Sequence, residues 1–261
     1  MTVQNLAART PGAKIESEEA GTMMLYRLGG AAAVLTLLTA LAEILITFLP
    51  GGYTAAGTVT EWFALLQTNP FLGLRNLGLL NILMVALGIP VILALYTAHR
   101  KVNQPFAALA MIIAFTGTAV FYATNRAFPM LELSGQYAAA ATESQRAVLE
   151  AAGQAMLSTG QSHTPGTFLA FFLSEIGGIL MGLVMLRGKV FSRAAAWTCT
   201  AGYGLLLVYE ILVSFVPATH DAALIVAMAG GLSNMAWYIL AARGLFKLGQ
   251  KTPVFELGEQ E

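Results

Sequence analysis

Three glutamates lie inside stretches of sequence that are otherwise apolar enough to cross a membrane: Glu43, Glu175 and Glu210. A charge at the bilayer centre costs roughly 2.5–3.5 kcal/mol on the insertion scale, so an ionisable residue there is by default a candidate functional residue. At the helical rise per residue, each glutamate is about 8–12 Å from the same side of the membrane. The spacing therefore predicts a carboxylate cluster in the outer half of a helical bundle.

Other polar residues on the predicted helices could complete such a cluster. Arg75 and Arg126 could pair with the carboxylates through short charge-assisted hydrogen bonds, or burial could keep a glutamate neutral. The hypothetical ligand-binding set is Glu43, Arg75, Asn76, Arg126, Glu175, Glu210 and Asn234. The alternative is a satisfied polar core that fixes the register of the helices and binds nothing.

The histidines make a weaker case for a metal site. His163 and His220 fall on the predicted outer side, where they could join the glutamates as ligands. No pair of ligand residues has a tight spacing such as H-E-x-x-H, so solvated loop histidines are the better interpretation. We expect no metal and no cofactor, and the sequence identifies no catalytic residue.

The composition is that of an integral membrane protein. Of the 261 residues, 57% are hydrophobic and 11% charged, whereas soluble domains carry about 25% charged residues. The formal net charge is zero and no basic surface is evident, which argues against a nucleic-acid partner. We therefore expect an all-α integral membrane protein whose main partner is the lipid bilayer.

Six stretches have the length of about 20 residues that a membrane-spanning helix needs. They run from about Leu28 to Leu49, Phe71 to Ala98, Phe106 to Thr124, Thr167 to Leu186, Ala194 to Phe215, and Ala222 to Ala242. Lys and Arg are concentrated on one side, with 11 there and three on the other. Because cytoplasmic loops carry the excess of basic residues, the pattern predicts a six-helix bundle with both termini in the cytoplasm.

This topology divides the chain into three parts. Residues 1–22 are expected to be a disordered cytoplasmic tail, residues 23–249 the transmembrane domain, and residues 250–261 a cytoplasmic C-terminal tail. Extracytoplasmic segments are expected at about 50–70 and 125–166.

Both extracytoplasmic segments contain the spacing of a capping box, in which an N-cap hydroxyl and the side chain three residues later cap a helix. Thr58 and Glu61 have this spacing, as do Thr142 and Gln145. The segments therefore predict amphipathic helices on the outer face. These helices are either membrane-surface connectors or a lid over a cavity.

Three short segments carry a resemblance to a known family. They are YRLGG at Tyr26–Gly30, NPFLGLRN at Asn69–Asn76, and RGKVFSR at Arg187–Arg193. The chain resembles a family of bacterial multi-pass membrane proteins known as domain of unknown function 4386, from about Tyr26 to Gly249. The resemblance implies six helices in a bacterial inner membrane and supplies neither a substrate nor catalytic residues.

Three functions are compatible with these features. The first is binding or transport of a small polar ligand, a cation or a lipid head group in an outward-facing cavity. The second is an outer-leaflet intramembrane enzyme that uses a glutamate as general acid or base. The third is an accessory structural protein whose polar core only specifies packing.

Overall fold

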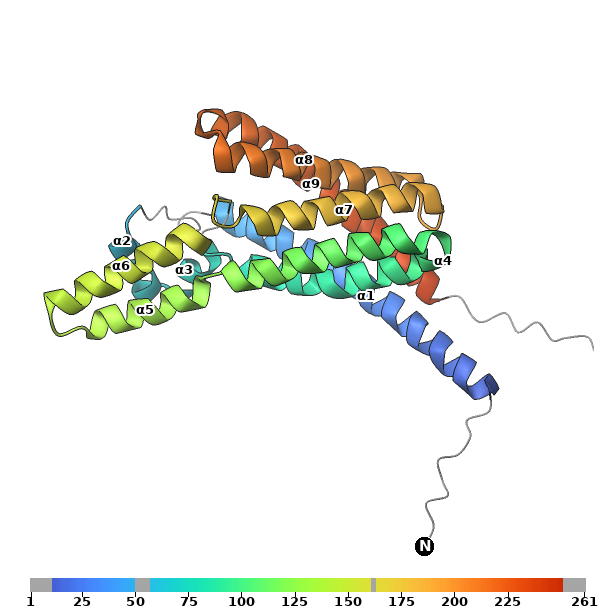
Figure 1. Cartoon of the computed structure of the whole chain (residues 1–261), viewed down its shortest axis with the longest axis horizontal. Helices are drawn as coiled ribbons and strands as arrows, with labels where there is room; N and C mark the ends of the chain where they lie inside the picture. Colours follow the sequence, from blue (N-terminus) through green and yellow to red (C-terminus); the bar gives the residue numbers. More distant parts are fainter. Residues whose placement is uncertain (1–10, 50–56, 161–162, 251–261) are drawn as a thin grey trace, which may run out of the picture.

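The computed structural model describes residues 11–49, 57–160 and 163–250, and within these ranges all regular structure is helical (Figure 1). The elements are α1 (Pro11–Phe48), α2 (Val59–Thr68), α3 (Pro70–Asn76), α4 (Leu79–Thr124), α5 (Ala127–Ala139), α6 (Glu143–Gly160), α7 (Phe168–Gly188), α8 (Arg193–Phe215), the 3₁₀ helix η1 (Pro217–Thr219) and α9 (His220–Gly249). Residues 1–10 and 251–261, which belong to the two predicted tails, lie outside the described residues.

Five stretches of the described chain are long and apolar enough to cross a membrane. They are Glu18–Thr47, Leu79–Ala139, Phe168–Gly188, Arg193–Phe215 and Asp221–Gly249. The protein is therefore a multi-pass membrane protein.

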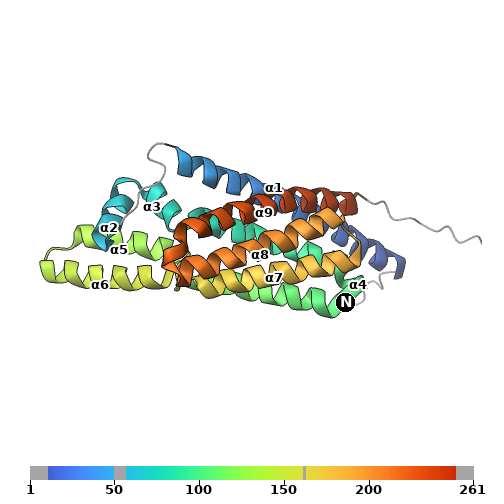
Figure 2. The same cartoon turned by 90° about the horizontal axis from the view of Figure 1, so that it is seen from above.

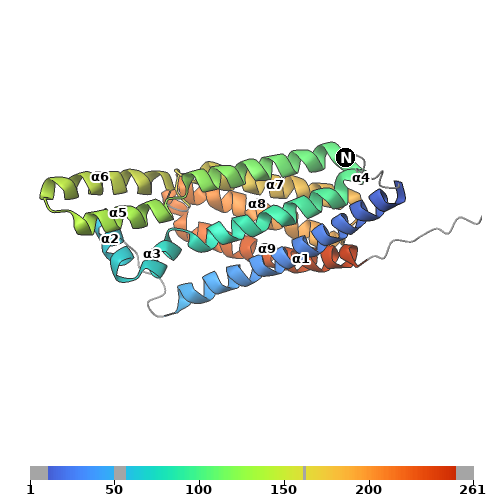
Figure 3. The ribbon, with the colours of Figure 1, turned by 90° about the horizontal axis from the view of Figure 1, so that it is seen from below.

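The helix α4 reverses its direction at Asn103. The backbone of Asn103 is not helical, with φ −153° and ψ 72°. The two ends of α4 lie side by side, since the Tyr122 hydroxyl donates to the Ile82 carbonyl (3.4 Å). Next to them, the Asn125 amide donates to the Leu77 carbonyl (3.4 Å). The halves of α4 before and after Asn103 are thus antiparallel, as Figure 3 shows.

The helices differ from the predicted boundaries at two places. The helix expected over Phe71–Ala98 is broken between α3 and α4, where Gly78 has a left-handed φ of 94° that interrupts a helix. The disordered tail expected over residues 1–22 overlaps α1, which begins at Pro11. Proline suits the first helical position, and the alanines, glutamates and lysine that follow favour a helix.

The long helices form a ring that follows the order of the chain. α1 contacts α4, α4 contacts α7, α7 contacts α8, α8 contacts α9, and α9 returns to α1. Figure 2 shows the helices running roughly parallel to a common axis. Helices on opposite sides of the ring make at most slight contact, so its centre must be filled by side chains or be hollow.

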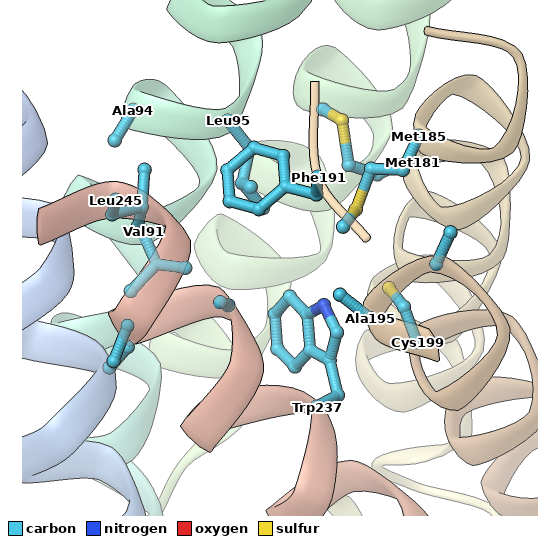
Figure 4. Packing of buried hydrophobic residues seen from close by; sticks show 14 of the residues in the cluster. Val91, Ala94, Leu95, Met181, Met185, Phe191, Ala195, Cys199, Trp237 and Leu245 are labelled. Atoms are coloured by element: carbon cyan, nitrogen blue, oxygen red, sulfur yellow. The ribbon is translucent and has the colours of Figure 1, made fainter. Parts of the chain in front are cut away.

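Near the Asn103 turn the centre of the ring is filled. Buried side chains from α4, α7, α8 and α9 converge there around Phe191 and Trp237 (Figure 4). Met181 and Met185 of α7 pack into the same cluster, with Leu95 of α4. We call this end of the bundle the Asn103 end, and its interior is closed by this core.

The interface between α7 and α8 is close because α7 presents glycines to it. A side chain at Gly178 would collide with the ring of Tyr203, and one at Gly182 with Thr200. Gly178 and Gly182 have the small-xxx-small spacing that is typical of close helix packing in membranes.

The short helices α2, α3, α5 and α6, which we call the side unit, form a separate cluster at the other end of the bundle (Figures 1 and 3). Trp62, Phe63 and Leu66 of α2 pack there against Met130 of α5. The Tyr137 hydroxyl of α5 donates to the Glu150 carboxylate of α6 (2.9 Å), and this hydrogen bond raises the pKa of Tyr137. Both predicted capping boxes are formed, at Thr58 with Glu61 and at Thr142 with Gln145.

Candidate functional site

A cavity of about 400 Å³ lies inside the ring, between the side-unit end and the core near Asn103. Its lining comes from α1, α4, α7, α8 and α9, and no residue of the side unit lines it. On α7 the lining residues are Phe171 and Ser174, whereas the core residues Met181 and Met185 lie further along the helix. The volume is within the range of about 300–1,000 Å³ found for small-molecule sites.

The cavity wall is largely aliphatic with a few polar groups. Glu43 of α1 and Asn234 of α9 are the two members of the predicted binding set that line it. The aromatic rings of Phe171, Tyr203 and Tyr238 also belong to the wall. The Oδ1 atom of Asn234 is buried and makes no hydrogen bond within the described part of the chain.

Glu43 pairs with Arg75, as the sequence analysis suggested for this arginine. The Arg75 guanidinium lies 2.8 Å from Oε1 of Glu43, and its Nε donates to Oε2 at 3.2 Å. Arg75 also donates to the hydroxyl of Thr47, to the backbone carbonyl of Glu43 (3.0 Å) and to Oδ1 of Asn76 (3.0 Å). The Arg75 side chain is 2% exposed and that of Glu43 is 33% exposed, so the carboxylate is the accessible partner.

Glu210 pairs with His163, which the sequence analysis assigned to a solvated loop. Nδ1 of His163 lies 2.7 Å from Oε2 of Glu210, whose side chain is fully buried. The Ser214 hydroxyl donates to Oε1 of the same carboxylate (3.4 Å). His163 does lie in the loop before α7 and its side chain is 38% exposed, but its pairing with Glu210 was not predicted, because it is a long-range contact that local spacing does not reveal.

Glu175 of α7 interacts electrostatically with Glu210 of α8, the helix that packs against α7. It is 6% exposed, and its Oε2 makes no hydrogen bond within the described residues. Its neighbour Ser174 lines the cavity.

The other predicted residues are placed elsewhere. Arg126 forms the N-cap of α5 and packs against Gly160 at the end of α6, and no ion pair to it occurs in the described ranges. Its Nε is buried and makes no hydrogen bond there. His220 begins α9, and its side chain lies outside the described part of the structure.

The structure thus divides the predicted cluster. Glu43, Arg75 and Asn76 meet where α1 approaches α3, and Glu175 and Glu210 meet between α7 and α8. Across the described residues, no three His, Cys, Asp or Glu side chains are grouped so as to hold a metal ion.

Comparison with known families matches residues 31–240 to the domain of unknown function DUF4386. The chain belongs to this family. A search of the curated proteins and of the solved structures found no match. The DUF4386 region contains the whole cavity lining, from Thr36 to Tyr238. It also contains all three glutamates of the predicted cluster.

Proposed function

We propose that this DUF4386 protein binds, and moves across the bacterial cytoplasmic membrane, a small ligand with an apolar body and one cationic or hydrogen-bond-donating group. The observation that carries the proposal is the hollow centre of the ring. Its wall combines aliphatic surface with the Glu43 carboxylate and the Asn234 amide. Ligand sites are typically apolar clefts with a few convergent polar groups.

The topology proposed for this function has six crossings. The reversal at Asn103 divides the longest apolar stretch into two antiparallel halves, each long enough to span a bilayer. The basic residues favour both termini in the cytoplasm. On this topology the Asn103 end is cytoplasmic and closed by the core, while the side unit and the cavity lie toward the outside.

The polar groups of the cavity wall favour a ligand that carries a hydrogen-bond donor. The carbonyl oxygen of Asn234 is buried and unpaired among the described residues, and a buried acceptor left unsatisfied costs about 1–3 kcal/mol. The Glu43 carboxylate, although paired with Arg75, is one-third exposed and has lone pairs left to accept a hydrogen bond. Aromatic residues, which can attract a cation, also line the cavity at Phe171, Tyr203 and Tyr238.

Cysteine modification tests whether the cavity is open to water and from which side. Thr118 lines the cavity, so a Thr118→Cys variant in a Cys199→Ala background carries a single reporter thiol. A membrane-impermeant trimethylammonium methanethiosulfonate should react with it from the extracytoplasmic side. Lack of reaction from either side would contradict the proposed cavity.

Two glycine variants serve as a matched pair. Gly88 lines the cavity and a side chain there meets nothing within 4 Å, so Gly88→Leu should fill the cavity without a clash and slow the modification. Gly204 of α8 also has open space around its Cα but does not line the cavity, so Gly204→Leu should leave the rate unchanged.

A ligand series with one apolar body tests the polar preference. 1-Adamantylamine, 1-adamantanol and adamantane-1-carboxylate differ only in the group presented to the wall. We expect protection of the Thr118→Cys thiol to fall in that order. Equal protection by the carboxylate, or protection that survives in Gly88→Leu, would contradict the proposed binding mode.

A further inference from the structure

His163, Glu210 and Glu175 form a row of titratable groups that begins at the surface and ends near the cavity. The His163 side chain is 38% exposed and that of Glu210 is fully buried. Glu175, beside Glu210, is 6% exposed. The row therefore joins His163, which water can reach, to the Glu175 carboxylate, which is almost completely buried.

The imidazole of His163 is held in place at the surface end of this row. It stacks on Phe171 with ring centroids 4.7 Å apart and contacts Tyr209 edge-on at 5.1 Å. The backbone of His163 has a left-handed φ of 56°, which is uncommon for a residue other than glycine. With Nδ1 bonded to Glu210, the other ring nitrogen is left to exchange protons with water.

Glu175 is the group in this row that its surroundings do not satisfy. Its Oε2 is buried with no hydrogen bond in the described part of the chain, and the Glu210 carboxylate interacts with it electrostatically. Two buried carboxylates side by side cannot both ionise at low cost, and one of them takes a proton. Chains of histidine and carboxylate residues within membrane helices commonly serve as proton relays.

We propose that His163, Glu210 and Glu175 form a proton relay from the extracytoplasmic surface to the wall of the central cavity. His163 takes a proton from water on its free ring nitrogen and releases the Nδ1 proton to Oε2 of Glu210. Glu210 then passes a proton to Glu175, which ends neutral and leaves Glu210 ionised. His163 is left with its proton on the outer ring nitrogen until exchange of ring protons with water, or the reverse transfer, restores the proton to Nδ1. Reversal of the steps returns the proton to the outside.

Few other titratable groups face the relay. Tyr209 and Tyr203 of α8 interact electrostatically with Glu175. α4, which packs on α7, carries Arg100 and Lys101 beside the Asn103 turn at the far end. α9, which packs on α8, has the exposed Asp221 at its start, and its basic residues, Arg243 and Lys247, lie toward the Asn103 end.

The relay reaches the cavity through α7. Phe171, on which His163 stacks, and Ser174, which precedes Glu175, both line the cavity. A change in the charge of Glu175, which does not itself line the cavity, therefore changes the electrostatic potential at the neighbouring cavity wall. The effect of Glu175 on the cavity rests on the proposed function, and it makes the proton the coupling ion for transport. The relay itself does not depend on a ligand.

Infrared spectroscopy of the full chain in lipid nanodiscs tests the relay directly. A protonated carboxyl band absent from Glu175→Gln reports the proton on Glu175, and transfer into D₂O gives its exchange rate. Positioned proton donors and acceptors accelerate transfer by about 10²–10⁴-fold, so His163→Phe, which keeps the ring stacking, should slow this exchange at least about tenfold. Glu210→Gln should slow it similarly, and the exposed Glu143→Gln should not.

The outcomes separate the relay from the cavity. An exchange rate in His163→Phe equal to that of the wild type, or no protonated Glu175 band, would overturn the relay. If the charge of Glu175 acts on the cavity, the Thr118→Cys thiol should respond to external pH through Glu175. The ratio of its modification rate with Glu175 present to its modification rate in Glu175→Gln should therefore change with external pH. A constant ratio overturns the coupling alone, while an unreactive thiol overturns the cavity and leaves the exchange result standing.

Discussion

Removing the charge of Glu43 should destabilise the protein markedly, because Arg75 would keep its charge in a buried position. In Glu43→Gln the guanidinium loses two carboxylate contacts, at 2.8 and 3.2 Å, and keeps the Thr47 hydroxyl, the carbonyl of residue 43 and the Asn76 side chain. Breaking a buried ion pair by removing one partner costs about 3–5 kcal/mol. Since Glu43 is one-third exposed and three acceptors remain, we expect about 2–3 kcal/mol.

That loss corresponds to a Tm lower by about 5–10 °C for a chain of this size. Thermal unfolding in detergent or nanodiscs, followed by circular dichroism, would measure it. Arg75→Met should be destabilising as well, but the double variant Glu43→Gln with Arg75→Met should recover most of the loss because no unpaired charge remains. The matched control is Glu143→Gln, which breaks an exposed pair with Arg146 (2.9 Å).

Two results would refute this reasoning. One is a Tm for Glu43→Gln that differs from the wild type no more than that of Glu143→Gln does. The other is additivity of the two single variants, since an interacting pair must deviate from it.

Two further predictions concern the side unit and the α7–α8 interface. The N–H groups of Gly57 and of the N-cap residue donate to Glu61 and lower its pKa below the ordinary 4.5, so this cap stabilises α2 above that value and is lost as the pH falls through the folded pKa. The protection of the Gly57 amide, taken as its exchange rate relative to the intrinsic rate at the same pH, should therefore fall on acidification in the wild type, and a Glu61→Gln variant with the same pH dependence would contradict this. At the helix interface, Gly178→Ala drives a methyl group into the ring of Tyr203 and should cost about 1–3 kcal/mol. Gly204→Ala, on α8 but with nothing within 4 Å of the added methyl group, should be neutral or slightly stabilising by thermal unfolding. Equal losses in the two variants would argue against the close packing.

The helical class and most of the long helices follow from the sequence because they depend on local apolar length. The predicted helices over Thr167–Leu186 and Ala194–Phe215 agree closely with α7 and α8. Local signals also mark the turn inside α4, where Pro105 follows Asn103 closely and proline suits the start of a helix. The break at Gly78 was missed because a single glycine in an apolar run is compatible with a helix unless a left-handed backbone is known to be required.

The arrangement of the carboxylates was predictable only in part. The pairing of Glu43 with Arg75 follows from the cost of an unpaired charge and from the positions of both near one side of the membrane. Nothing in the local sequence shows that His163, 47 residues before Glu210, bonds to it, because that contact depends on how the loop before α7 returns to the bundle. A shared depth was the only available signal, and it does not tell which helices are neighbours.

The ring has one interface that joins the ends of the chain, that between α1 and α9. Its other contacts link helices that follow one another, and Arg27 Nε donates across this last interface to the carbonyl of Gly249 (2.9 Å), 222 residues away. Because α9 follows the other ring helices in the chain, insertion in chain order would leave the future cavity as a groove facing the acyl chains of the bilayer until α9 inserts. Closure of the ring therefore either expels a lipid chain or encloses one, and lipid analysis of the purified protein would tell which compound the cavity first contains.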